Sequence, residues 1–188
     1  MNYLIVGLGN IGPDYYKTRH NIGFDILDQL ARDRELTFKS ERLADKANFR
    51  FKSRNFHLIK PTTYMNLSGR AVKYWMDQLK IKQENVLVLV DDLALPLAQV
   101  RLKLRGGDGG HNGLKDIQEK LGNANYARLR FGIGDNYSKG QQVKFVLGRW
   151  TTEEEKAIEP AIKTCCEAII AFATIGPART MNQFNKKA

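Results

Sequence analysis

The sequence predicts an α/β domain with a mixed sheet. Short apolar runs typical of buried strands alternate along the chain with stretches of helical periodicity. One pair of alternating runs lies close enough in the sequence to form a hairpin, and a length of 188 residues fits one domain. We therefore predict a single domain over residues 1–188, with a twisted, mixed, mostly parallel sheet flanked by helices.

The first half of the chain contains the predicted hairpin. Residues 2–8 form an apolar run, and apolar side chains recur at helical spacing over residues 22–30. Residues 47–52 alternate between apolar and polar side chains, and residues 56–59 are the expected hairpin partner. Residues 71–79 return to helical spacing. These patterns predict the order strand, helix, hairpin, helix.

The second half begins with a continuous apolar run typical of a central strand. This run covers residues 86–90 and ends in the paired acids Asp91 and Asp92. The expected elements after it are a strand over 100–104, a glycine-rich loop over 106–110, a helix over 113–121, a strand over 128–133 and a long helix over 152–175. Strands and helices thus alternate to the end of the chain.

The composition indicates a polyanionic partner. Lys and Arg number 30 against 20 Asp and Glu, which gives a formal charge of +10. Cys165 and Cys166 are adjacent on the last predicted helix, where they are badly placed to form a disulfide. We interpret them as core thiols in a reducing compartment. No apolar run approaches the roughly 20 residues of a membrane span. We expect a cytoplasmic protein with no membrane partner.

Three glycines after the first predicted strand have the spacing of a dinucleotide-binding motif. Gly7, Gly9 and Gly12 match G-x-G-x-x-G, but that motif needs its third glycine at the start of a helix. Pro13 and two tyrosines intervene before helical periodicity begins. We expect no cofactor, and we interpret the glycines as a sharp turn that presents Asn10 at the carboxyl end of the strand.

Two of the three histidines stand in His-Asn pairs after polar or glycine-rich loops, at His20 and His111, whereas His57 lies in the hairpin pattern. His20 suits either a structural cap or a general base. A base needs an orienting group, which Asp91 could supply, although a capping or turn role also suits that acid. Asn66 could hold a carbonyl oxygen or cap the helix after it.

The spacing of candidate reactive groups disfavours two other chemistries. The sequence has no G-x-S-x-G motif, and neither cysteine is near a histidine in the sequence, which disfavours a covalent acyl intermediate. The histidines and acids have no spacing typical of metal ligands, so we expect no metal. Water activated by histidine, with asparagine and backbone N–H groups near a carbonyl oxygen, is the remaining hypothesis.

Five blocks occur in order along the chain: Gly-Leu-Gly-Asn at 7–10, Thr-Arg-His-Asn-x-Gly at 18–23, Tyr-Met-Asn-Leu-Ser-Gly at 64–69, Asp-Asp at 91–92 and Gly-Gly-His-Asn-Gly-Leu at 109–114. Together they resemble bacterial-type peptidyl-tRNA hydrolase over nearly the whole chain. The resemblance implies that family's fold. It also implies hydrolysis of the ester joining a peptide to the 3′-terminal ribose of tRNA, by a monomer without a metal.

The resemblance also implies roles for individual residues. His20 would be the base that activates water, Asp91 its orienter, and Asn10 and Asn66 the groups that position substrate and stabilise the oxyanion. The remaining residues implied to contact substrate or tRNA are Tyr15, Asn21, Tyr64, Met65, Lys103, His111, Asn112 and Arg130. Lys103 and Arg130 would clamp the 5′-phosphate of tRNA. Without the resemblance, Lys103 fits the solvent-facing side of a strand equally well.

The chain departs from the family's usual sequence at Ile11, Ala94, Arg105 and Asp108. Arg105 and Asp108 change the second glycine-rich loop, where they could alter how RNA docks. None of the four replaces the base, its orienter or the two asparagines. An alternative function is that of a catalytically silent relative that binds RNA as a scaffold, and the presence of all four catalytic candidates favours the enzyme.

Overall fold

A seven-stranded mixed sheet forms the centre of the protein in the computed structural model, which describes residues 1–185. The strands are β1 (Asn2–Gly7), β2 (Lys39–Glu41), β3 (Ala44–Phe51), β4 (Arg54–Pro61), β5 (Val86–Asp92), β6 (Val100–Lys103) and β7 (Ala127–Gly132). Their order across the sheet is β2-β3-β4-β1-β5-β7-β6. β1 pairs in parallel with β4 and β5, and β5 with β7, whereas β3 and β6 run the other way. The predicted mixed, mostly parallel sheet is confirmed.

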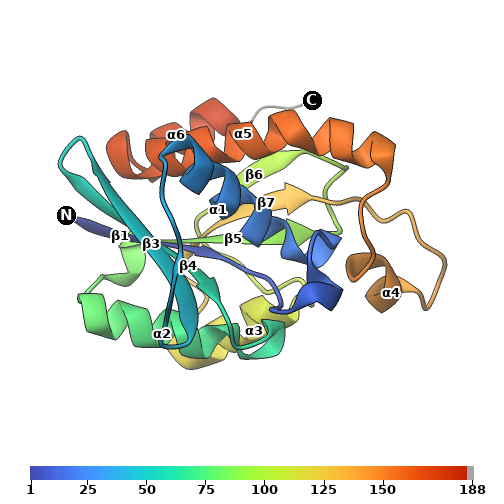
Figure 1. Ribbon diagram of the computed structural model, residues 1–188, viewed down its shortest axis with the longest axis horizontal. Helices are drawn as coiled ribbons and strands as arrows, with labels where there is room; N and C mark the ends of the chain where they lie inside the picture. Colours follow the sequence, from blue (N-terminus) through green and yellow to red (C-terminus); the bar gives the residue numbers. More distant parts are fainter. Residues whose placement is uncertain (186–188) are drawn as a thin grey trace.

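Helices cover both faces of the sheet (Figure 1). The helices are α1 (Ile22–Asp33), α2 (Ser68–Leu79), α3 (Asn112–Leu121), α4 (Gln142–Val146), α5 (Thr152–Thr174) and α6 (Pro177–Phe184), and short 3-10 turns lie at Pro13–Tyr15, Arg19–Asn21, Met65–Leu67 and Gln83–Asn85. α1, α5 and α6 lie on one face, α2 and α3 on the other, and α4 stands at one end. No helix among residues 1–185 has the length and apolar character needed to cross a membrane.

The two covered faces explain the apolar runs of the central strands. In β1, Tyr3 and Ile5 join the core beneath α1 and α5, whereas Leu4 and Val6 join the core beneath α2 and α3. Successive side chains of a strand point to opposite faces, so a strand covered on both sides is apolar throughout. The parallel strands β4, β1, β5 and β7 end at the same edge of the sheet. The chain therefore delivers the segments that follow these strands to one place.

Gly7, at the end of β1, and Gly23, in α1, allow these two elements to pack closely. A Cβ atom on Gly7 would overlap the carbonyl oxygen of Gly23, and one on Gly23 would overlap the backbone of Leu8. The end of β1 and the start of α1 thus touch through backbone atoms. α1 begins at Ile22, well beyond Gly12, so the third glycine does not open the helix. This arrangement explains the glycine spacing without a nucleotide.

Three short elements were not predicted from the sequence. β2 is three residues long and exposed, and α4 is five residues long, so neither is long enough to show a period. α6 begins at Pro177 after Gly176, whose φ of 92° favours glycine. After α6, the Asn185 carboxamide accepts a hydrogen bond from the Leu102 N–H (2.7 Å) and donates one to the Leu102 carbonyl (2.8 Å). The carboxamide thereby pairs with the outer side of the edge strand β6.

Replacing Gly7 with alanine should lower the free energy of unfolding by about 1–3 kcal/mol, because the added methyl group must displace backbone atoms at both elements. Urea unfolding measures the change. Gly107→Ala is the matched control, since an added Cβ there meets no atom within 4 Å. A Gly7→Ala protein as stable as the control would contradict the close approach.

Candidate active site

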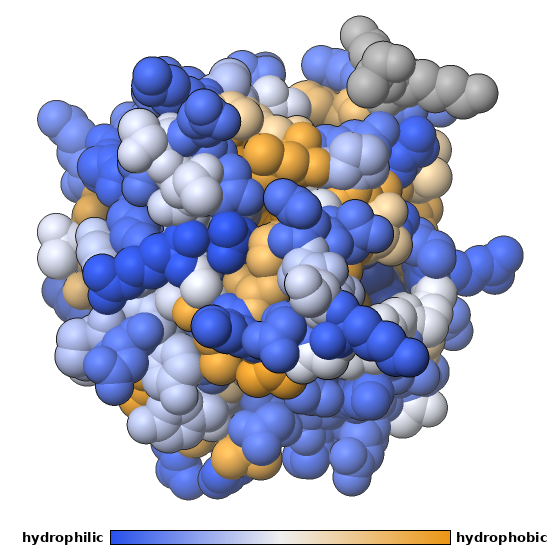
Figure 2. Space-filling model, turned by 90° about the vertical axis from the view of Figure 1, so that its right-hand side faces the viewer, coloured by the Kyte–Doolittle hydropathy of each residue, from blue (hydrophilic) through white to orange (hydrophobic). Residues whose placement is uncertain are grey.

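A pocket of about 670 Å³ opens at the carboxyl edge of the parallel strands. The segments after β1 and β4 supply Asn10, Met65 and Asn66 to its wall, and the end of β5 supplies Asp91. Of the other predicted site residues, His20, Lys103, His111, Asn112 and Arg130 also line it. The fold thus brings together predicted residues that are far apart in the sequence. Figure 2 shows the face on which α4 lies, where hydrophobic residues gather between hydrophilic ones.

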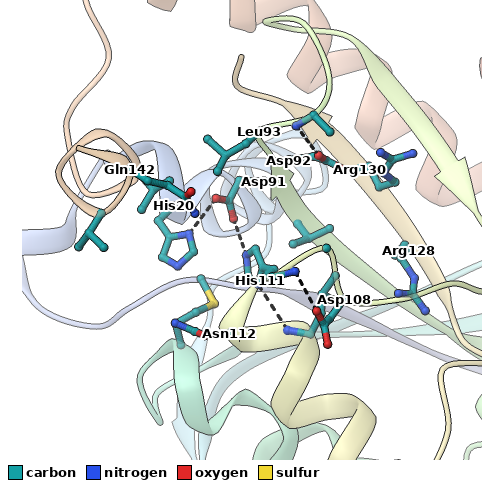
Figure 3. Close-up of a pocket in the computed structure, with 18 of the residues that line it drawn as sticks. His20, Asp91, Asp92, Leu93, Asp108, His111, Asn112, Arg128, Arg130 and Gln142 are labelled. Carbon is teal, nitrogen blue, oxygen red and sulfur yellow. Dashed lines mark hydrogen bonds and ion pairs between the residues drawn. The ribbon is translucent and has the colours of Figure 1, made fainter. Parts of the chain in front are cut away.

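Asp91 lies between two histidines (Figure 3). Its Oδ2 atom is 2.8 Å from Nδ1 of His20, and its Oδ1 atom is 2.8 Å from Nε2 of His111. Asp91 ends the buried strand β5 and is only 5% exposed, so the backbone fixes its position. Burial raises the pKa of Asp91, but the two imidazoles outweigh that effect and hold it well below its usual range. Asp91 is therefore a carboxylate at neutral pH.

His20 is placed to act as a base. Since a carboxylate only accepts hydrogen bonds, Nδ1 of His20 carries the proton that points at Asp91, and Nε2 keeps a free lone pair. Burial lowers the pKa of His20, whereas the charge of Asp91 and its hydrogen bond raise it, and the net shift is upward. A raised pKa makes His20 a stronger base once it is deprotonated.

His111 has a second set of partners that fixes its tautomer. Its Nδ1 atom accepts hydrogen bonds from the backbone N–H groups of Gly113 (3.1 Å) and Leu114 (3.4 Å) at the start of α3. Nδ1 therefore carries no proton, and Nε2 donates its proton to Asp91. His111 caps the helix and holds the free side of the Asp91 carboxylate. The sequence placed His111 at the site but did not reveal this contact with Asp91.

The His20, Asp91 and His111 cluster also has the composition of a metal site, because one ligand atom of each lies within 4.8 Å of the others. Both histidine nitrogens that face Asp91 are at hydrogen-bond distance from it. Protons account for these two contacts, and a metal ion would have to displace them. The geometry therefore fits a hydrogen-bonded triad better than a metal centre.

Asn10 offers an amide N–H group to the pocket. Its Oδ1 atom accepts a hydrogen bond from the backbone N–H of Met65 at 2.6 Å, so the oxygen is occupied. The backbone of Asn10 is held by the Asn21 carboxamide, which accepts from its N–H (2.9 Å) and donates to its carbonyl (2.8 Å). The Nδ2 group of Asn10 remains as a donor for a substrate oxygen.

Asn66 and Met65 reach the pocket on a 3-10 turn that follows a strained residue. Tyr64 has φ 63° and ψ 158°, a conformation that costs a non-glycine residue about 1–3 kcal/mol. It turns the chain so that Met65 can donate to Asn10. Asp116 of α3 then accepts a hydrogen bond from the Gly69 N–H at 2.8 Å, near the start of α2. Asn66 itself is exposed at the pocket wall.

The basic residues of the pocket lie to one side of the triad. Arg130 of β7 forms an ion pair with Asp92, next to Asp91 on β5 (Figure 3). Lys103, at the end of the edge strand β6, is exposed. Both cations line the pocket, and their role as a phosphate clamp stays a prediction.

Three predicted contact residues, Tyr15, Asn21 and Tyr64, do not line the pocket. Asn21 is 2% exposed and uses its carboxamide to hold the Asn10 backbone, which makes it a support for the site. The Tyr15 ring packs edge-on against the Tyr64 ring, with centroids 6.3 Å apart, and Tyr64 is half exposed. Asn21 therefore supports the pocket through the Asn10 backbone, whereas Tyr15 and Tyr64 contact each other outside the pocket wall.

The contribution of α4 was not predicted from the sequence. Val143, Val146 and Leu147 line the pocket, and although they have i, i+3, i+4 spacing, three apolar residues are too few to establish a helical period. The link from this segment to the base is Arg19, whose guanidinium donates to the Phe145 carbonyl at 3.0 Å and pairs with Glu154 at 2.8 Å. Because His20 follows Arg19 directly, these contacts also fix the base.

An α/β fold with a buried carboxylate, an oriented histidine and amide donors around one pocket is an arrangement typical of a hydrolase. The sequence model of the family described as peptidyl-tRNA hydrolase matches residues 4–188. The chain belongs to the peptidyl-tRNA hydrolase family.

Individual relatives agree with this assignment. The chain is 52% identical over 187 residues to a peptidyl-tRNA hydrolase of Cytophaga hutchinsonii, with 100% of both chains covered. It is 55% identical over 185 residues to that of Porphyromonas gingivalis, covering 98% of this chain and 100% of the other. The crystal structure of peptidyl-tRNA hydrolase from Acinetobacter baumannii superposes with a TM-score of 0.91 at 36% identity, covering 97% of this chain and 94% of that one. The predicted family and fold are confirmed.

Replacing Asp91 with asparagine should lower the pKa of His20, because burial then acts without the opposing carboxylate. NMR titration of the imidazole signals measures this, and His57, whose pKa burial and Lys46 lower to about 4, serves as an internal reference. Asp92→Asn is the matched control, because Asp92 pairs with Arg130 and not with His20. An unchanged His20 titration in Asp91→Asn would contradict the coupling.

Proposed function

We propose that the protein hydrolyses the ester bond between a peptide and the 3′-terminal ribose of tRNA and releases free tRNA. The observation that carries the proposal is the 2.8 Å contact between His20 Nδ1 and Asp91 Oδ2 in the pocket wall, in a chain of the peptidyl-tRNA hydrolase family. A base oriented in this way can activate water without a covalent intermediate.

In the proposed reaction, Nε2 of His20 takes a proton from water as the water oxygen attacks the ester carbon. The negative charge that develops on the carbonyl oxygen is stabilised by the amide donors of Asn10 and Asn66. Asp91 stabilises the imidazolium that forms. The bond to the ribose 3′-oxygen then breaks, and His20 gives its proton to that oxygen, which leaves as the 3′-hydroxyl group. The carboxylic acid of the released peptide loses its proton to solvent. The products are a peptide with a free carboxylate and an intact tRNA.

The positive charge of the protein supports the proposal that the substrate contains tRNA. Lys103 and Arg130 line the pocket from the paired strands β6 and β7, and the whole chain carries a formal charge of +10. Phosphate contacts of such cations supply affinity that falls steeply with salt. We propose that these two residues hold the 5′-phosphate, and that the protein acts in the cytoplasm as a single-domain monomer.

The first test is release of the labelled acyl group from an N-acetyl-aminoacyl-tRNA. The protein should release it rapidly, and His20→Ala should lower kcat by a factor of about 10² to 10⁴, the usual contribution of a general base. kcat/KM should fall with decreasing pH through a pKa above the ordinary histidine value, because only deprotonated His20 can act as the base.

Unblocked aminoacyl-tRNA is the substrate control, and Lys163→Ala, exposed on α5, is the protein control. Salt-dependent tRNA binding with an intact ester would indicate the RNA-binding scaffold instead of the enzyme. Near-normal kcat in His20→Ala would refute the base assignment.

Replacing Lys103 with alanine should raise KM and leave kcat nearly unchanged, because phosphate contacts position the RNA and do not take part in the chemistry. The slope of log KM against log salt concentration should fall by about 1, as expected for one lost phosphate contact. Steady-state kinetics at several salt concentrations, with Lys163→Ala alongside, measure both effects. A large loss of kcat would argue against a clamp.

A further inference from the structure

Arg128 is a buried cationic side chain at the pocket wall. It lies on β7 two residues before Arg130, so both side chains leave the same face of the sheet. Arg130 reaches Asp92 at the pocket wall, whereas Arg128 is only 1% exposed and lies beneath the glycine-rich loop (Figure 3). Nothing in the proposed reaction uses Arg128.

The guanidinium of Arg128 bonds to backbone carbonyl groups of two segments. Nη1 donates to the carbonyls of Gly106 (3.0 Å) and Gly107 (3.2 Å) in the loop. Nη2 donates to the carbonyls of Ala124 (2.8 Å) and Tyr126 (3.2 Å), in the segment between α3 and β7. The guanidinium also stacks on the Tyr126 ring, 4.0 Å from its centroid. The side chain therefore joins the start of the loop to the body of the sheet.

The contacts of the buried Arg128 guanidinium are not those that would make the folded protein most stable. The four bonds go to neutral carbonyls, and Nε is buried with no hydrogen-bond partner among residues 1–185. Burying a charge under such conditions is costly, and an apolar side chain at this position would avoid that cost. A planar group that spans two segments does, however, set the position of a glycine-rich loop that has few side chains to pack.

The same loop carries His111. From the anchored residues the chain passes through Asp108, whose carbonyl accepts from the His111 N–H at 2.9 Å and whose side chain accepts from the Gly110 N–H at 2.8 Å. Gly109 and Gly110 both have positive φ, so the turn has little stiffness of its own. Its far end is His111, which donates to Asp91 at 2.8 Å.

We propose that Arg128 is a positioning residue for catalysis: it fixes the 106–111 loop so that His111 holds Asp91 in the orientation that His20 requires. The proposal rests on the proposed hydrolase function. Arg128 acts through Asp91 and does not touch the substrate. Small displacements of a catalytic group reduce the rate strongly, by up to about a hundredfold for an ångström.

The first variant is Arg128→Lys, which keeps the charge but replaces the planar fork, whose two Nη atoms bond to separate segments, with a single ammonium nitrogen. We expect kcat on N-acetyl-aminoacyl-tRNA to fall between about tenfold and a hundredfold, with little change in KM. Arg179→Lys, exposed on α6, is the matched control and should behave as the unaltered protein. Unchanged kcat in Arg128→Lys would overturn the proposal, and so would a raised KM at constant kcat, which indicates RNA binding.

A double-mutant cycle tests whether Arg128 acts through His111. If it does, adding Arg128→Lys to His111→Ala should lower kcat by no more than about twofold beyond His111→Ala alone. Losses that multiply would show that Arg128 acts by another route and would overturn the proposed one.

An NMR measurement separates this proposal from the proposed function. The chain has only three histidines, so single substitutions assign the imidazole nitrogen signals. In the unaltered protein, His111 should show the tautomer with its proton on Nε2, and Arg128→Lys should convert part of it to an exchanging mixture. This readout needs no activity, so an inactive but well-ordered protein would refute the hydrolase while the loop anchor stands. An unchanged His111 signal in Arg128→Lys would refute the anchor.

Should Arg128→Lys fail to fold, Asp108→Ala tests the same loop from its partly exposed side, where it removes the bond to the Gly110 N–H and a negative charge near Arg128. We expect a smaller loss of kcat, between about twofold and tenfold, and the same change in the His111 signal. Normal kcat and an unchanged signal in Asp108→Ala would overturn the dependence of His111 on the loop.

Discussion

The site depends on one carboxylate held by two imidazoles at the end of a buried strand. Asp91 is fixed by the backbone of β5, which is paired on both sides. His20 and His111 come from two separate segments, one from the turn before α1 and the other from the start of α3. Because each carboxylate oxygen accepts from one ring, neither ring can rotate without leaving a buried acceptor unpaired. The two loops are thereby fixed relative to the sheet.

Backbone contacts bring these loops within reach of Asp91. Gly7 and Gly23 let the start of α1 touch the end of β1, which places His20 beside the sheet edge. On the other side, Asp116 ties α3 to the start of α2, so the segments that carry His111 and Asn66 are joined. The chemistry therefore uses few side chains, whereas their placement uses close packing in which even a methyl group has no room.

Most of the fold could be predicted from the sequence because most helices and strands are long enough to show a clear pattern of apolar residues. The run at 86–90 and the helices at 71–79 and 152–175 were recognisable, and the structure has elements at all three places. β2 and α4 were missed because a few residues carry no measurable period, and their conformation depends on neighbours distant in the sequence. The antiparallel hairpin was predictable because its two alternating runs are adjacent.

The candidate site was predictable in its members but not in its connections. Residues such as Asn10, His20 and Asp91 follow strands or loops, and the sequence could indicate that they meet at one edge of a sheet. It could not indicate that Asn21 holds the Asn10 backbone or that His111 binds the far oxygen of Asp91, because hydrogen-bond partners depend on side-chain directions in three dimensions. The contacts of Arg128 could not be predicted for the same reason, because the strand pattern does not distinguish it from the other basic residues.

The contact of Asn185 with β6 has a consequence for the association of this protein with itself. An unpaired edge strand exposes N–H and carbonyl groups that can recruit a strand of another molecule. The carboxamide of Asn185 occupies both groups of Leu102, in the middle of β6. One side chain after α6 thus blocks the growth of the sheet at this edge, and a chain shortened before Asn185 would regain a site for edge-to-edge pairing.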